Sequence, residues 1–200
     1  MIDASGNALE VTAARTGAAF DVLTLLPTAT AKTYLKIDGT AEDVIIAALI
    51  SGAAELLRED TGIVLGAEAW RVVMDQFPAD GVIRVPVWPV RSITAITVAD
   101  AAYTAATVSA SVYDGVLTVT PALIVAAADG AGWPTVAAPK GGIVVTLAAG
   151  YENSGAVPAA LVEILKLKVA ALYLRGATGA DLIEAAYQAA IVPWRVAWIG

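Results

Sequence analysis

The sequence predicts an α+β fold, in which an antiparallel β module is inserted into a small helical unit of about four helices and an extended C-terminal tail follows. Apolar residues recur at helical spacing over 30–60 and again over 158–192. Between these segments, short β-branched runs alternate with turn residues. The expected parts are an N-terminal arm at 1–27, a helical unit at 28–65 and 156–193, a β module at 66–150, and a tail at 194–200.

The first helical segment follows residues 1–27, which have no sustained periodicity, end at Pro27 and are expected to form an arm or an irregular strand pair. A short helix is expected over 30–37, because Asp38-Gly39 is a typical stop signal. A longer helix is expected over 41–60, with Gly62 as its terminator. Four residues are expected to form the apolar face of this helix: Ile45, Leu49, Gly52 and Leu56.

The β module is expected to consist of short strands separated by turns. The strand-like runs are 70–77, 82–85, 92–98, 108–113, 116–120 and 143–147. The most specific local signal is Asp114-Gly115, since Asp-Gly between strand-like flanks favours a two-residue hairpin turn. We therefore expect a β-hairpin centred on this dipeptide.

Helical texture returns at Pro158, a favourable first helical residue, and continues to Arg175-Gly176. A final helix is expected over 180–192, with Thr178 and Asp181 at the spacing of a capping box. Its apolar stripe contains Ile183, Tyr187 and Ala190. These helices are expected to complete the helical unit that the β module interrupts.

The composition favours a protein that buries apolar surface against a partner. Apolar residues make up 58% and charged residues 16% of the chain, against roughly half and about a quarter in average domains. Much of the excess is alanine and valine, so small side chains account for part of the mean hydropathy of +0.72. We expect no membrane partner, because the most apolar stretch, 157–174, is interrupted by Glu163, Lys166 and Lys168. Asp3 and Glu10 likewise argue against an export signal.

The residue types exclude most enzyme chemistry. The chain has no histidine and no cysteine, which removes most triads, proton relays, zinc sites and disulfides. Its net charge of -7 repels phosphate backbones, so we expect the protein not to bind DNA tightly, although DNA can slide past such a surface. The glycines at 130 and 132 lack the third glycine and the following helix of a phosphate loop.

Two carboxylate pairs remain as candidates for catalysis, Glu42-Asp43 and Glu59-Asp60. Both have a structural interpretation at the ends of the expected helix 41–60. Asp43 follows Thr40 at capping-box spacing, and the second pair is expected to form a solvated helix end. We therefore expect no catalytic residue, no cofactor and no metal ligand, and hence no enzyme activity.

The tail is unusual because it is apolar and holds two of the five tryptophans. One interpretation is that it folds back onto its own core. The other is an anchor that docks on another subunit, since tryptophan and arginine are typical hot-spot residues and alternating apolar side chains suit the addition of a strand to a partner's edge. The residues of the expected partner-docking tail are Trp194, Arg195, Val196, Trp198 and Ile199.

In order and spacing, segments over roughly residues 28–195 resemble the head-tail connector (adaptor) family of long-tailed phages and related gene transfer agents. The collinear segments are AKTYLKID at 31–38, ED at 42–43, EDTG at 59–62, Trp70, DQFP at 75–78, IRVPVWPVRSI at 83–93, WP at 133–134, AGY at 149–151, VP at 157–158, LYLR at 172–175 and PWR at 193–195. The alanine-rich composition also resembles that of proteins from high-GC bacterial hosts, which favours a gene transfer agent.

The resemblance implies a structural adaptor that forms a ring of typically about twelve copies, which closes through a heterologous interface. Such a ring docks on the portal protein beneath the capsid, receives the next head-completion or tail component, and lets DNA pass through its channel. The expected location is a virion or phage-like particle assembled in the bacterial cytoplasm. The alternatives are another virion structural protein, such as a head-closure factor or tail terminator, and a small ligand-binding or enzymatic β module.

Overall fold

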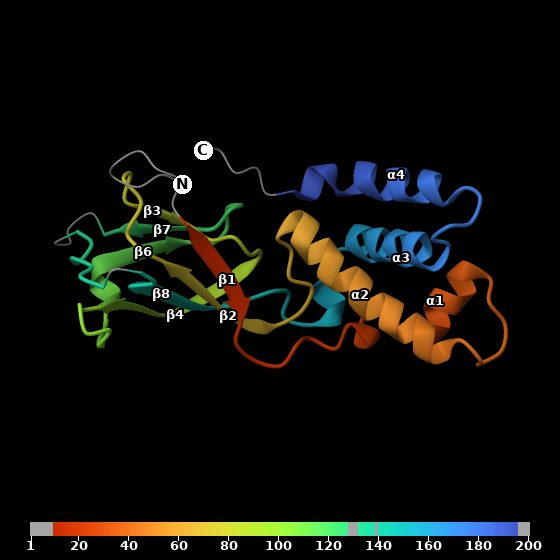
Figure 1. The fold of residues 1–200 in the computed structure, drawn as a ribbon, viewed down its shortest axis with the longest axis horizontal. Coiled ribbons are helices and arrows are strands. Elements are labelled where there is room, and N and C mark those ends of the chain that lie inside the picture. Colours follow the sequence, from red (N-terminus) through yellow and green to blue (C-terminus); the bar gives the residue numbers. More distant parts are fainter. Residues whose placement is uncertain (1–9, 128–131, 139, 196–200) are drawn as a thin grey trace. The chain divides into compact units, whose positions relative to one another are not determined.

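The computed structural model describes residues 10–127, 132–138 and 140–195, and it separates the chain into two compact units (Figure 1). Residues 20–66 and 151–195 form a helical unit, which we call the α unit. The described residues of 10–19 and 67–150 form the second unit, called the β unit. The predicted α+β fold class is confirmed, with helices before and after an antiparallel β insertion along the chain.

The α unit is built around α3, which packs against both α2 and α4, while α1 packs on α2 and α3. Its elements are η1 Val22–Thr24, α1 Thr28–Leu35, α2 Asp43–Thr61, η3 Ser154–Ala156, α3 Ala159–Tyr173, α4 Ala180–Ile191 and η4 Val192–Trp194. Fully buried apolar side chains from three helices form its core: Ile46, Ile50, Leu57, Leu161, Leu165, Val169, Tyr187 and Ile191.

The apolar face expected for α2 is wrong by one residue. The buried side chains are Ile46, Ile50, Ala53, Leu57 and Thr61, whereas Ile45 is 56% exposed and Gly52 is also exposed. The first half of α2 is apolar around most of its circumference, so helical spacing alone does not determine which side meets α3.

Helix ends were predicted with mixed success. Gly62 ends α2 as expected, with φ of 77° and its N–H donating to the Arg58 carbonyl at 2.7 Å. The expected capping boxes are wrong. The N-cap residues of α2 and α4 are Glu42 and Gly179, and neither makes a side-chain hydrogen bond that caps its helix. Tertiary packing positions these two helix starts in place of local side-chain caps.

The β unit contains two antiparallel sheets. One has the strand order β1-β2-β8-β4-β5 and the other β3-β7-β6. The strands are β1 Val11–Arg15, β2 Glu68–Met74, β3 Val82–Arg84, β4 Val90–Ala99, β5 Ala105–Thr107, β6 Tyr113–Val116, β7 Leu123–Ala126 and β8 Ile143–Ala149. Residues 11–15 lie in the segment expected to be an arm or an irregular strand pair, and they form the edge strand of the larger sheet.

The core of the larger sheet lies on one face of β2 and β8. Alternate residues of these strands are buried: Trp70, Val72 and Met74 on β2, and Ile143, Val145, Leu147 and Ala149 on β8. The two strands pair along their full length, from Glu68 opposite Ala149 to Met74 opposite Ile143. This period of two is the pattern of a sheet with one buried face.

The expected Asp114-Gly115 hairpin turn is wrong. Both residues lie inside β6, opposite Val125 and Ile124 of β7, a strand that the sequence did not reveal. A Cβ at position 115 would lie 2.8 Å from the Cδ1 of Ile93, so glycine is needed here for close packing and not for a turn. The expected strand 108–113 is also wrong in large part, because η2 occupies Ala110–Val112.

Candidate functional site

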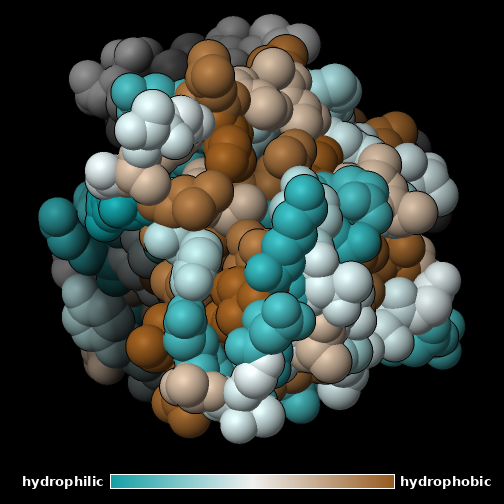
Figure 2. Space-filling view, turned by 90° about the vertical axis from the view of Figure 1, so that its right-hand side faces the viewer, coloured by the Kyte–Doolittle hydropathy of each residue, from teal (hydrophilic) through white to brown (hydrophobic). Residues whose placement is uncertain are grey.

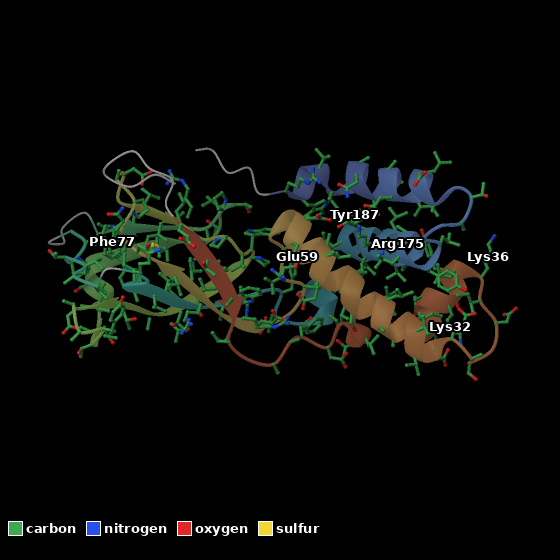
Figure 3. All side chains as sticks on the ribbon, viewed as in Figure 1. Lys32, Lys36, Glu59, Phe77, Arg175 and Tyr187 are labelled. Carbon is green, nitrogen blue, oxygen red and sulfur yellow. The ribbon has the colours of Figure 1, made fainter. Side chains whose placement is uncertain are left out.

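The two carboxylate pairs considered for catalysis both connect helices of the α unit. At the start of α2, Glu42 accepts a hydrogen bond from the Tyr173 hydroxyl at 2.8 Å, and Asp43 pairs with Lys32 at 2.6 Å. At its end, Asp60 accepts a hydrogen bond at 2.7 Å from the hydroxyl of Tyr187, the α4 residue labelled in Figure 3. These contacts fix both ends of α2 against α1, α3 and α4.

The two tyrosines are held in their neutral form by these contacts. The hydrogen bond to Glu42 is the main cause that raises the pKa of Tyr173. For Tyr187, which is fully buried, burial contributes most to a raised pKa, and the hydrogen bond and charge of Asp60 add to it. Neutral hydroxyls serve here as donors to carboxylates, which is a structural use of both groups.

A third polar connection joins α3 to α4 through the buried Lys168. Its ammonium group donates to both carboxylate oxygens of Glu184, at 3.0 and 3.2 Å, and lies 4.3 Å from the ring centre of Tyr187. The pKa of Glu184 is lowered, and the largest cause is the hydrogen bond from Gln188. Lys168 lowers this pKa further, while burial opposes both effects. The buried charge is therefore paired and hydrogen-bonded, as stability requires.

The described part of the chain contains no group of three or more acidic side chains arranged to hold a metal ion. A hollow of about 570 Å³ lies in the β unit beside Val98, Val108 and Trp133, with Asp100 as its acidic residue. The Asp100 carboxylate accepts the backbone N–H groups of Ala102 and Thr104 at 2.8 and 2.9 Å, so it stabilises a turn. Within the described residues, no helix has both the length and the apolar character needed to cross a membrane.

Only the beginning of the expected docking tail lies within the described residues. Trp194 ends η4 and is half-buried, while Arg195 is exposed and its guanidinium donates to the side chain of Gln188 at 2.8 Å. Val196, Trp198 and Ile199 lie outside the described residues. The docking tail therefore stays a prediction.

Two helices of the α unit expose apolar side chains to solvent. The α2 outer face consists of Val44, Ile45, Ala48 and Gly52, and the α4 outer face consists of Leu182, Ala185, Ala186, Ala189 and Val192. The largest exposed fractions are 83% for Val44, 77% for Leu182 and 60% for Val192. Figure 2 shows the end of the α unit where α2 and α4 begin, with apolar residues at the surface among hydrophilic ones. Contiguous exposed apolar patches are typical of protein-binding surfaces, which makes these two faces candidate surfaces.

The sequence did not reveal these two faces as candidate surfaces. It assigned Ile45 and Gly52 to the packed side of α2, although α3 covers the opposite side. On α4, alanines make up most of the exposed face and give a weak hydropathy signal. One feature of the sequence could have indicated them: each helix has apolar residues around more of its circumference than packing against one neighbouring helix would bury.

Comparison with known proteins finds a match among solved structures. No family model and no curated protein matches the chain. A chain in the neck of an empty gene transfer agent (GTA) particle, computed with C6 symmetry, is 24% identical with a TM-score of 0.77. Chains in the virion of a native GTA particle and in the neck of a native particle computed with C12 symmetry are 24% and 22% identical, each with a TM-score of 0.76. Each match covers 94% of this chain and 97% of the other chain.

This chain has the same fold as those chains. The likeness extends over nearly the whole length of both, so it includes the α unit and the β unit together. It also includes the segments on which the resemblance to connectors was based.

Two of the segments that resemble connectors, DQFP at 75–78 and WP at 133–134, meet in the β unit. The rings of Phe77 and Trp133 stack at 4.5 Å between centroids, with Tyr113 parallel to Trp133 at 6.4 Å. The indole N–H of Trp133 donates to the Gly81 carbonyl at 2.7 Å, and Asp75 accepts the N–H of Gly141 at 2.6 Å. These residues hold loops of the β unit in place. Their presence in the sequence is therefore explained by a structural role.

Proposed function

We propose that this protein is a structural head-tail connector (adaptor) subunit that forms a ring beneath the portal and joins the capsid to the tail. The observation that supports the proposal most is the fold shared over 94% of the chain with a chain in the neck of a gene transfer agent particle. The collinear sequence segments support it independently. In this proposal the protein is not an enzyme and works by binding other proteins.

A closed ring requires two different complementary surfaces on each subunit, because every copy meets one neighbour on each side. The α unit offers two separate exposed apolar faces, on α2 and α4. The similar neck chains come from particles computed with C6 and C12 symmetry, which is the behaviour expected of ring subunits. We therefore propose that the first partner of the chain is another copy of itself.

The other proposed partners lie above and below the ring. They are the portal protein and the next head-completion or tail component, with the docking tail from Trp194 onward as the anchor on one of them. DNA passes through the channel without specific binding, and a net charge of -7 suits a wall to which a polyanion does not adhere. The proposed location is a phage-like particle assembled in the bacterial cytoplasm, and the gene transfer agent is the form that the comparisons favour.

Deleting the gene from a particle-producing strain tests this proposal. We expect electron micrographs to show DNA-filled heads beside unattached tails, and the intact gene supplied on a plasmid to restore tailed particles. Normally tailed particles in the deletion strain would contradict the connector role. A head-closure factor or tail terminator differs by position, so a tagged copy should be imaged and is expected at the first ring beneath the portal.

A further inference from the structure

Gly52 lies in the middle of α2 and has no explanation within its own chain. It is exposed and helical, and among the described residues a Cβ built at this position meets no atom within 4 Å apart from its chain neighbours and the backbone of its own helix. Glycine is the least favourable residue after proline in a helix interior, because it costs the most backbone entropy. Neither a turn nor a neighbouring helix of the same chain requires glycine here, whereas close approach of another molecule does.

The surroundings of Gly52 form a flat apolar surface. Ala48 lies one turn before it on the same outer face, and Val44 and Ile45, which are 83% and 56% exposed, continue that face to the helix start. Small residues at the centre of a helix face allow a second helix backbone to approach closely. The α2 outer face is thus shaped to receive a helix.

The α4 outer face provides a helix of matching shape. It lies on the side of α4 that faces away from the buried Tyr187 and Ile191. The two faces share the i, i+3, i+7 spacing: Ile45, Ala48 and Gly52 on α2, and Leu182, Ala185 and Ala189 on α4. Because α3 lies between α2 and α4, each copy presents the two faces on different sides (Figure 1).

Charges at the ends of the faces favour helices that run in the same direction. Arg195, which is exposed, would then lie near the negative end of the α2 dipole, beside Glu59, which pairs with Arg58 at 3.5 Å. Asp181 would lie near the positive end of α2. The opposite direction would place each of these two side chains at the end of the α2 dipole that has the same sign as its own charge.

We infer that the α4 outer face of one copy packs against the α2 outer face of the next copy, with the helices in the same direction and Ala189 facing Gly52. The inference rests on the proposed ring and names the surfaces that close it. This interface is heterologous, so repeating it around an axis joins every copy to two neighbours.

Substitutions at Gly52 separate folding from assembly. At a concentration where the chain is monomeric, Gly52→Ala is expected to raise the melting temperature by about 2 °C, because alanine favours the helix. Gly52→Leu is expected to weaken self-association on the order of tenfold or more in sedimentation velocity, because its side chain keeps the helices apart. The control is Ala160→Leu, an exposed position on α3 outside both faces, which should leave self-association unchanged. Wild-type association of Gly52→Leu would overturn the inference.

Cysteine cross-linking tests the pairing itself, since the natural chain has no cysteine. The full chain carrying both Ala48→Cys and Ala185→Cys is expected to give a ladder of disulfide-linked copies on mild oxidation. Each single variant should stay unlinked, because its thiol faces an alanine of the neighbour. The absence of a ladder, or a linked dimer from Ala48→Cys alone, would overturn the α2–α4 pairing.

The outcomes also separate this inference from the connector role. Separated heads and tails in the deletion strain without a ladder would leave the connector proposal standing and reject this interface. A ladder together with normally tailed deletion particles would support the interface and reject the connector role.

Discussion

At the scale of single residues, Tyr187 contributes to the α unit in two ways. Its ring is fully buried between α3 and α4, and its hydroxyl is the donor to Asp60. Tyr187→Phe keeps the ring but removes the donor, so we expect the free energy of unfolding to fall by about 1 kcal/mol in urea denaturation. Tyr103→Phe, at a tyrosine that is 57% exposed, is the matched control and should change stability little. If Tyr187→Phe were as stable as the wild type, the hydrogen bond to Asp60 would contribute nothing to stability, because water would replace the lost donor.

Glu184 gives the α unit a pH dependence. Its pKa lies below the ordinary value of 4.5, so its contribution to stability is present above that value and is lost as the pH falls through the lower, folded-state pKa. We expect the wild-type chain to lose more stability than Glu184→Gln between about pH 5 and pH 3. The difference should be modest, because the Glu184 side chain is 41% exposed.

The measurement for this prediction is urea denaturation at several pH values. Glu163→Gln is the control, since Glu163 forms an exposed ion pair with Lys166 on one helix and its removal should leave the pH dependence close to that of the wild type. Parallel pH curves for the wild type and Glu184→Gln would contradict the assigned role of Glu184.

At the scale of elements, α2 carries two glycines whose substitution by alanine should have opposite effects. Gly62 has φ of 77°, in the left-handed region that penalises a Cβ, and it ends the helix. Gly62→Ala is therefore expected to destabilise the chain by about 1 kcal/mol, whereas Gly52→Ala stabilises the same helix. Thermal unfolding of the two variants at equal low concentration tests this, and a loss of stability in both would show that Gly52 has an unrecognised role in folding.

These two glycines also show what the sequence can predict about an element. Gly62 was predicted because a helix terminator acts through local backbone geometry. Gly52 was assigned to the packed side of α2 because spacing defines a face but not the neighbour that covers it. Gly115 was misread as a turn for a related reason, since its partner is Ile93, distant in sequence. Local signals therefore gave the helices and the end of α2, and long-range packing decided which faces are buried and where several strands lie.

At the scale of the whole molecule, the α+β class could be predicted, while several strands and the candidate surfaces depended on the folded structure. The alternation of helical and β-branched segments determined the α+β class without reference to tertiary contacts. The α2 and α4 outer faces became visible only when the position of α3 was known. The docking tail is the reverse case, because its two tryptophans stand out in the sequence but Trp198, with Val196 and Ile199, lies outside the described residues.

The tail should act on assembly and not on folding. We expect truncation after Arg195 to leave the α unit intact, because the Arg195 contact with Gln188 and the half-buried Trp194 are both retained. Thermal unfolding of the truncated chain should match that of the full chain. In the deletion strain, the truncated gene should fail to restore tailed particles, since Trp198 and Ile199 are missing from the anchor.

A double substitution refines the same test. Trp198→Ala with Ile199→Ala keeps the chain length and removes only apolar side chains, so it should reproduce the truncation if the side chains bind the partner. Self-association through α2 and α4 should persist in both variants, because the proposed interface ends at Arg195. Tailed particles formed by either variant would show that the tail is not an anchor, and a truncated chain that unfolds earlier than the full chain would instead favour a tail that folds back onto its own core.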